Sequence, residues 1–203
     1  MNNRIKDIVN NADIEYQNWI LNNSYKDCHI KGLHSIAINS NDGYLSRVFI
    51  TDDNHELTKD AIAVHSHRYS LGITVLKGYI HHRLYFPTKD VFPYNDAIRL
   101  QSFRYHSKLN ENKGCFSKYG GSMLFDTNLS VLHPNSYIYL KSSDLHDVYC
   151  LQQVNAWLCV EGKDNYSYNN IVYSNKDLTQ WSDEGYYNKF EAFDEIKHYI
   201  NML

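Results

Sequence analysis

The sequence has little of several features that would point to a class of function at once. Its four cysteines include no CxxC pair, so we predict neither a zinc knuckle nor a disulfide framework. No apolar run approaches the roughly 18 residues that a transmembrane helix needs, and the polar, asparagine-rich start differs from a signal peptide. These absences predict a cytoplasmic protein with no membrane partner.

An excess of charge of one sign is also missing. The formal net charge is −3, with 21% charged and 43% hydrophobic residues, so we expect no nucleic-acid partner. The same composition excludes a disordered chain. At 203 residues the chain is long enough for one domain with an ordinary core.

The pattern of apolar residues predicts an all-β fold with helical extensions. Apolar side chains at helical spacing predict one amphipathic helix over 5–22 and another over 192–202. Between them lie short runs rich in β-branched and aromatic residues, with no helix in between, which favours an antiparallel sandwich or barrel. We predict strands at 34–38, 45–51, 62–69, 73–76, 79–86, 98–106, 123–125, 137–140, 146–151 and 154–160.

The predicted strands divide the chain into three parts. These are a helical extension (1–33), a barrel (34–161) and a polar, tyrosine-rich tail with a helix (162–203) that we expect to wrap the outside of the barrel. Residues 87–96 and 108–121 are predicted to be loops, the second because it contains a Gly-Gly pair, and 113–121 could form a lid. A single domain overall is expected.

The most informative residues are two histidines one position apart, His65 and His67. On a strand, side chains alternate between faces, so both rings would point the same way. In a helix they would lie roughly 200° apart and could not share an ion. A strand therefore gives a pair of imidazoles that could hold one metal, and His146, at the start of a later predicted strand, is the candidate for a third ligand.

This arrangement resembles the cupin superfamily over 62–160, about half of the chain. His65 and His67 match the histidine pair of the first cupin motif, Gly78 its closing glycine, and His146 the single histidine of the second motif. Leu71 stands where the motif glutamate is expected, and the second motif lacks its common proline and glycine. The resemblance implies a cupin-type β-barrel (double-stranded β-helix, or jelly roll) with a mononuclear site.

The resemblance also implies a cofactor and an activity. Three neutral imidazoles suit a divalent metal, with Fe(II) favoured and Zn, Ni, Cu or Mn as alternatives. This ligand set is similar to that of the three-histidine thiol dioxygenases, which lack the glutamate. The strand after His146 lacks the Ser, His and Tyr array of the cysteine-type enzymes, so thiol oxidation is one option among several.

Other residues are candidates for a substrate pocket. His82 lies on the apolar face of its strand, Arg99 and Arg104 could bind a carboxylate or phosphate, and aromatic side chains could hold a ring or sugar. A hydrogen-bonded core histidine, solvated arginines and core packing are the simpler interpretations. The aromatic candidates are Tyr137, Tyr139 and Trp157.

Three functions follow from these residues. The first is a metal-dependent dioxygenase acting on a small molecule. The second is a non-catalytic cupin that binds a sugar or nucleotide, and the third is a metal-independent sugar-nucleotide isomerase or epimerase with His65 or His67 as general base. The resemblance also suggests a homodimer formed through edge strands.

Overall fold

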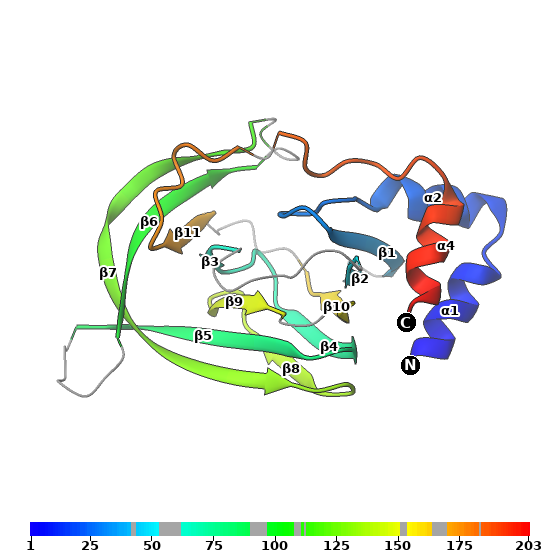
Figure 1. The fold of residues 1–203 in the computed structure, drawn as a ribbon, viewed down its shortest axis with the longest axis horizontal. Helices are drawn as coiled ribbons and strands as arrows, with labels where there is room; N and C mark the ends of the chain where they lie inside the picture. The colour runs from blue at the N-terminus through cyan, green and yellow to red at the C-terminus, as the bar shows by residue number, and fades with distance from the viewer. Residues whose placement is uncertain are drawn as a thin grey trace.

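The computed structural model describes residues 1–41, 44–52, 62–89, 97–107, 111, 113–150, 154–163, 170–182 and 184–203. Strands dominate these residues, and three helices lie together at one end of the molecule, near both termini (Figure 1). The elements, in chain order, are α1 (Asn2–Asn10), α2 (Ile14–Asn23), β1 (Leu33–Asn41), β2 (Tyr44–Thr51), β3 (Val64–His65), β4 (Leu71–Lys77), β5 (Ile80–Thr88), β6 (Ile98–His106), β7 (Cys115–Leu132), β8 (Tyr137–Leu140), β9 (Leu145–Tyr149), β10 (Ala156–Glu161), β11 (Ile171–Ser174) and α4 (Phe193–Asn201).

Two antiparallel sheets form the body of the protein. One has five strands in the order β1-β2-β10-β4-β8, and the other closes into a barrel in the order β11-β3-β9-β5-β7-β6. Closure depends on β7, whose one half pairs with β5 and the other half with β6. The all-β prediction with helical extensions is confirmed, and the architecture is that of a jelly-roll barrel.

The helices cover the five-stranded sheet and bury an apolar core against it. The single helix predicted over 5–22 is two helices, because helical structure is interrupted at Ala12 and Asp13. Asp13 caps the second helix, since its side chain accepts a hydrogen bond from the backbone N–H of Tyr16 at 2.8 Å. Buried side chains from all three helices meet those of β1 and β2; they are Ile5, Val9, Ile20, Ile196 and Ile200 on the helices and Ile36, Ile38, Val48 and Ile50 on the strands. Among the described residues, no helix is long and apolar enough to cross a membrane.

The prediction of a loop over 108–121 is wrong for residues 115–121, which belong to β7. Gly120 and Gly121 lie where the pairing of β7 with β6 shifts register, between Gln101 and Phe103. Glycines inside a strand commonly mark such a bulge, so the Gly-Gly pair indicates a distorted strand here instead of a turn. A lid over 115–121 is excluded in this structure; 108–110 and 112 lie outside the described residues, as do 90–96 of the other predicted loop.

The tail also differs from its prediction. Residues Ile171–Ser174 form β11, which pairs with β3 on one side and β6 on the other and so belongs to the barrel. The strand predicted over 62–69 is reduced to the two residues of β3. The remaining predicted strands overlap observed ones, whereas the division into three parts at residues 33 and 161 stays a prediction.

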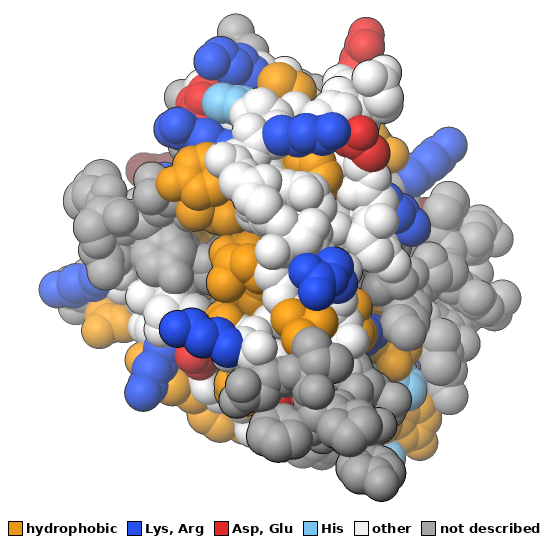
Figure 2. Space-filling view, turned by 90° about the vertical axis from the view of Figure 1, so that its left-hand side faces the viewer, with side chains coloured by type: hydrophobic (Ala, Val, Ile, Leu, Met, Phe, Trp, Pro, Cys, Tyr) orange, Lys and Arg blue, Asp and Glu red, His pale blue; other side chains and the backbone are white. Residues whose placement is uncertain are grey.

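The long strand β7 faces outward on the side of the barrel away from the helices. Figure 2 shows this face, where hydrophobic side chains lie among Lys and Arg side chains. Met123, Leu129 and Val131 of β7 are 40 to 50% exposed. Singly placed apolar side chains of this kind are normal on a protein surface.

Candidate metal centre

Three histidines converge where β3 and β9 meet. His65 and His146 are cross-strand partners, and His67 lies two residues beyond His65, after β3 has ended. One ring nitrogen from each of His65, His67 and His146 lies within 4.8 Å of the others. The structure thus brings together the three ligands that the sequence suggests, although His67 reaches the group from the irregular segment after β3 and not from a strand.

In His65 and His146, a hydrogen bond at Nδ1 leaves Nε2 to face the three-histidine group. Nδ1 of His65 lies 2.8 Å from the carbonyl oxygen of Ala63, to which it can donate, so Nε2 keeps its lone pair. Nδ1 of His146 lies 3.0 Å from Nε2 of His82, which again leaves Nε2 of His146 for the group. Metal-binding histidines are commonly oriented in this way through their second nitrogen.

The spacing inside the group suits a shared ion. Nε2 of His67 lies 2.8 Å from Nε2 of His146. Without a metal, this distance allows a hydrogen bond between the two rings. Two nitrogens that each lie about 2.0 to 2.1 Å from one metal are about 2.9 Å apart when they subtend a right angle at the metal, and about 3.3 Å apart in a tetrahedral site. The donor set therefore fits a divalent metal without a large rearrangement of either ring.

Burial keeps these imidazoles in the neutral form that binds metals. It lowers the pKa of His65, and it lowers the pKa values of His67 and His146 further, where the neighbouring His65 adds to the effect. A metal ligand must have an unprotonated nitrogen, so the site is prepared for binding at neutral pH.

The group contains no carboxylate among the residues that the structure describes. Leu71 occupies the position of the motif glutamate, and it is buried at the start of β4. Three neutral ligands leave the charge of a divalent ion uncompensated by the protein. An anionic ligand would therefore be attracted to the remaining coordination positions.

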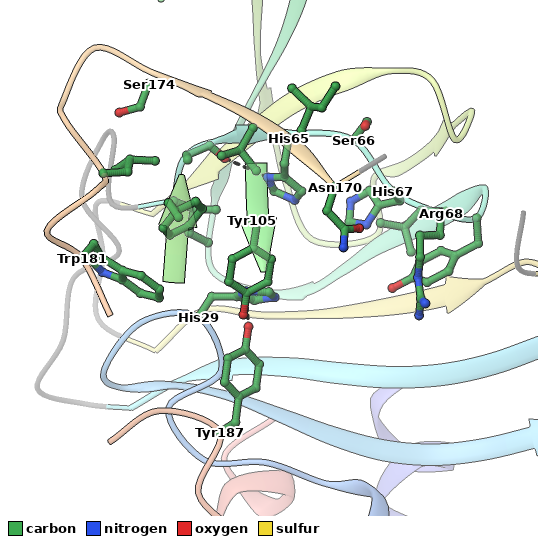
Figure 3. Close-up of a pocket in the computed structure, with 18 of the residues that line it drawn as sticks. His29, His65, Ser66, His67, Arg68, Tyr105, Asn170, Ser174, Trp181 and Tyr187 are labelled. Atoms are coloured by element: carbon green, nitrogen blue, oxygen red, sulfur yellow. Dashed lines mark hydrogen bonds between the residues drawn. The ribbon is translucent and has the colours of Figure 1, made fainter. Parts of the chain in front are cut away.

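A cavity of about 380 Å³ adjoins the group and lies between the two sheets. His65 and His67 line it, whereas His146 is only 2% exposed and lies behind them. Figure 3 shows His65 and His67 on one side of the cavity and Trp181 on the other, with Tyr105 between them. Drug-sized ligands occupy cavities of this volume, which is large enough for a small substrate.

The segment after residue 169 forms much of the cavity wall. Figure 3 shows Asn170 near His67, and Tyr187, whose hydroxyl lies 2.6 Å from Nδ1 of His29. None of the predicted site residues lies in this segment, although its unusual content of aromatic residues is a signal. Its side chains in the wall are Asn170, Ile171, Val172, Ser174, Lys176, Leu178, Trp181 and Tyr187.

Charged side chains in the wall are mostly basic. Arg68 and Lys176 line the cavity together with one carboxylate, Glu161. Glu161 forms an ion pair with Arg47 at 3.1 Å, and burial raises its pKa above the usual range. Among the described residues of the wall, two basic side chains therefore stand against one carboxylate, which is paired with Arg47.

Two of the other predicted pocket residues, His82 and Trp157, are buried and do not line the cavity. His82 is 3% exposed and binds His146 instead of lining the cavity. Trp157 is 5% exposed and stacks on Phe49 with ring centroids 5.7 Å apart, so it supports a cavity residue from the core.

The remaining four predicted pocket residues lie on the surface, which corrects the prediction. Tyr137 and Tyr139 are 63% and 59% exposed, because β8 is an edge strand whose alternate residues turn away from the core. Arg99 and Arg104 are both exposed, although strict alternation would place them on opposite faces. The register shift between Gln101 and Phe103 reverses the alternation between the two arginines.

The similarities of this chain to known proteins are with solved structures and are distant. No family model and no curated protein sequence matches the chain. Among solved structures it is similar to hydroxypropylphosphonic acid epoxidase from S. wedmorenis, with 9% identity and a TM-score of 0.40 over 69% of this chain and 56% of the epoxidase. It is also similar to an RmlC-like cupin from Shewanella frigidimarina (12% identity, TM-score 0.37, 67% of this chain and 80% of the cupin).

A third similar structure is a cupin superfamily protein from Desulfitobacterium hafniense, with 9% identity and a TM-score of 0.35 over 65% of this chain and 78% of that protein. This chain spans about half of the epoxidase, at 56% of that protein's length.

Proposed function

We propose that this chain is a cupin-type metalloprotein that holds one divalent metal ion through His65, His67 and His146 and acts as an oxygenase on a small anionic molecule. The observation that carries the proposal is the convergence of three neutral imidazoles, within 4.8 Å of one another, beside a cavity of about 380 Å³. Fe(II) is the favoured metal, with Zn, Ni, Cu and Mn as the alternatives that the same ligands accept.

A bound iron would supply open coordination positions at which a substrate and O2 can meet. The protein contributes the rest of the site. His82 and the Ala63 carbonyl hold the ligand rings, and Arg68, next to His67 in the chain, adds positive charge to the cavity wall. A substrate carboxylate or thiolate would provide the negative charge that the protein ligands lack.

Metal analysis tests this proposal directly. Protein purified without added metal is expected to contain close to one equivalent of a transition metal, and the variants His65→Ala, His67→Ala and His146→Ala are expected to lose most of it. His133→Ala is a matched control because His133 is exposed and remote from the group. Metal content that is unchanged in the three variants would overturn the proposal, provided that circular dichroism shows a native fold. Oxygen consumption with Fe(II) and a panel of small carboxylates and thiols then tests the activity.

A non-catalytic binding protein is the second candidate, and the aromatic wall of the cavity favours it. Tyr105, Phe116 and Trp181 offer ring faces on which a nucleotide base or a sugar could stack. Ligand binding that survives chelation, without oxygen consumption in the presence of metal, would support this function over an oxygenase.

A metal-independent isomerase or epimerase fits the site less well. The lowered pKa values of His65 and His67 weaken both rings as general bases, since a base works best with a pKa near the working pH. Turnover of nucleotide sugars that is insensitive to chelators would be needed to support it.

A further inference from the structure

A second cavity, of about 220 Å³, lies on the opposite side of β3 from the candidate metal centre. Val64 lines this second cavity, whereas its neighbour His65 lines the first, because adjacent side chains on a strand point to opposite faces. The wall comes from β3, β5, β6 and β11 of the closed barrel and includes Arg83, Tyr85, Leu100 and Tyr173.

Arg83 is an unusual residue to find in such a wall. It is 5% exposed, and its Nη2 atom is buried without a hydrogen-bond partner. Among the described residues, the carboxylate oxygen paired with Nη2 is Oδ2 of Asp147, which lies 3.6 Å away and accepts a hydrogen bond from the hydroxyl of Tyr85 at 2.7 Å. At 3.6 Å the pair interacts electrostatically, but the distance is too long for an N–H···O hydrogen bond.

Two aromatic rings also pack against Arg83, and neither provides a hydrogen-bond acceptor for Nη2 in the plane of the guanidinium. The rings of Tyr85 and Tyr149 lie 5.5 and 5.6 Å from its central carbon. A guanidinium carries five N–H donors, and a buried donor without an acceptor destabilises the folded state. Arg83 thus places a buried positive charge in the wall of the cavity, beside apolar side chains.

We propose that this cavity binds a small carboxylate anion through a two-pronged contact with Arg83. A planar carboxylate matches the fork of a guanidinium, and the apolar side chains of Val64, Ile98 and Leu100 suit a short hydrocarbon chain. A monoanion is favoured over a doubly charged phosphate because the carboxylate of Asp147 lies close to Arg83. About seven water molecules of roughly 30 Å³ each would fill the same volume, which leaves room for a short acid.

Calorimetric titration with three probes, sodium acetate, sodium butyrate and inorganic phosphate, tests the proposal. The protein is treated with EDTA, so that no probe can bind through a metal. We expect saturable binding of butyrate at one site per chain, weaker binding of acetate, and at least about tenfold weaker butyrate binding in Arg83→Gln, since a charge-assisted contact is lost. Arg104→Gln is the matched control, because Arg104 is exposed on β6 of the same barrel.

Two further variants keep the test decisive. Leu100→Phe narrows the cavity while Arg83 stays in place, so butyrate binding should weaken even if Arg83→Gln fails to fold. His67→Ala should bind butyrate as the wild type does, which separates this site from the candidate metal centre. Water alone occupies the cavity if none of the probes binds saturably, and that result, or equal butyrate binding by wild type, Arg83→Gln and Leu100→Phe, would overturn the proposal. Tighter binding of phosphate than of butyrate would overturn the assignment to a carboxylate.

Discussion

Nε2 of His82 lies 3.0 Å from Nδ1 of His146, so a histidine on β5 orients a candidate metal ligand on β9. When Nε2 of His146 binds a metal, Nδ1 of His146 carries the proton. Nε2 of His82 must then accept a hydrogen bond from this N–H group. We expect His82→Ala to weaken metal binding about 10- to 100-fold, the usual effect of removing such a partner. Titration of the metal-free protein with Co(II), followed by its visible absorption, measures this change.

Two variants sharpen that experiment. His82→Gln keeps a side-chain oxygen that can accept a hydrogen bond from Nδ1 of His146. Its affinity for Co(II) should therefore fall less than that of His82→Ala. His133→Ala should bind Co(II) as the wild type does, because its side chain is exposed and outside the group. Equal affinities for His82→Ala and the wild type would show that His146 needs no partner.

The stability of the metal-free protein should fall as the pH is lowered. Burial lowers the pKa of His82 to about 4, and it lowers the pKa values of His67 and His146 well below the usual range. The unfolded chain, with histidine pKa values of about 6.5, then binds more protons than the folded chain at acidic pH. The free energy of unfolding should be level above pH 6.5 and decrease from there toward pH 4.

Urea denaturation in EDTA over this range measures that slope, with carboxyl titration contributing at the acidic end. His67→Ala should flatten the slope between pH 6.5 and 5, where carboxyl groups contribute little. A slope that is the same in His67→Ala and wild type would contradict the prediction.

Gly78 is expected to be intolerant of a side chain. Its φ of +73° lies in the left-handed region, and a Cβ atom there would collide with the Oδ1 atom of Asn155, which accepts a hydrogen bond from the backbone N–H of Tyr79 at 3.0 Å. Gly78→Ala should lower the free energy of unfolding by at least about 1 kcal/mol. Gly121→Ala is the control, since a Cβ atom there meets nothing within 4 Å, and urea denaturation of both variants provides the comparison.

Trp157 should matter for stability far more than Tyr139. Trp157 is 5% exposed and stacked on Phe49, whereas Tyr139 is 59% exposed on an edge strand. We expect Trp157→Ala to cost about 3 to 5 kcal/mol of unfolding free energy and Tyr139→Ala less than about 0.5 kcal/mol. Thermal or urea unfolding distinguishes these values, and similar losses for the two variants would contradict the assignment of Trp157 to the core.

Pairing of β11 should be needed for metal binding although β11 contains no ligand. Val172 is the partner of His65 in β3 and of Phe103 in β6. Val172→Pro removes a backbone donor inside the barrel and should reduce metal content, whereas Val172→Ala should retain most of it. Full metal content in a folded Val172→Pro protein would show that β3 is held in other ways.

The convergence of the three histidines could be predicted because it depends on local spacing and on the order of two motifs. His65 lies on β3, and His146 lies near the start of β9. The two residues are cross-strand partners in the barrel. The burial of His82 agrees with its place on the apolar positions of β5, but those positions do not form a uniformly buried face, since Phe86 is exposed and Arg83 on the other face is buried. The direct contact of His82 with His146 needed the structure.

Other features depend on partners that are distant in sequence. The Gly-Gly pair has the composition of a turn, but the pairing of β7 with β6 makes it part of a bulged strand. The same bulge exposes Arg99 and Arg104 together, which period-two alternation cannot anticipate. β11 is four residues long and is stabilised by β3 and β6, so its own sequence gives little sign of it.

The place of β11 in the barrel also bears on how the protein is made. During synthesis, His65 leaves the ribosome long before Val172, its partner in β11, has been added to the chain. Contacts so far apart in sequence form slowly, because a long loop must close first. The nascent chain therefore carries its histidine pair for most of translation without the wall that later encloses it, and metal loading is expected to follow synthesis of the barrel's last strand.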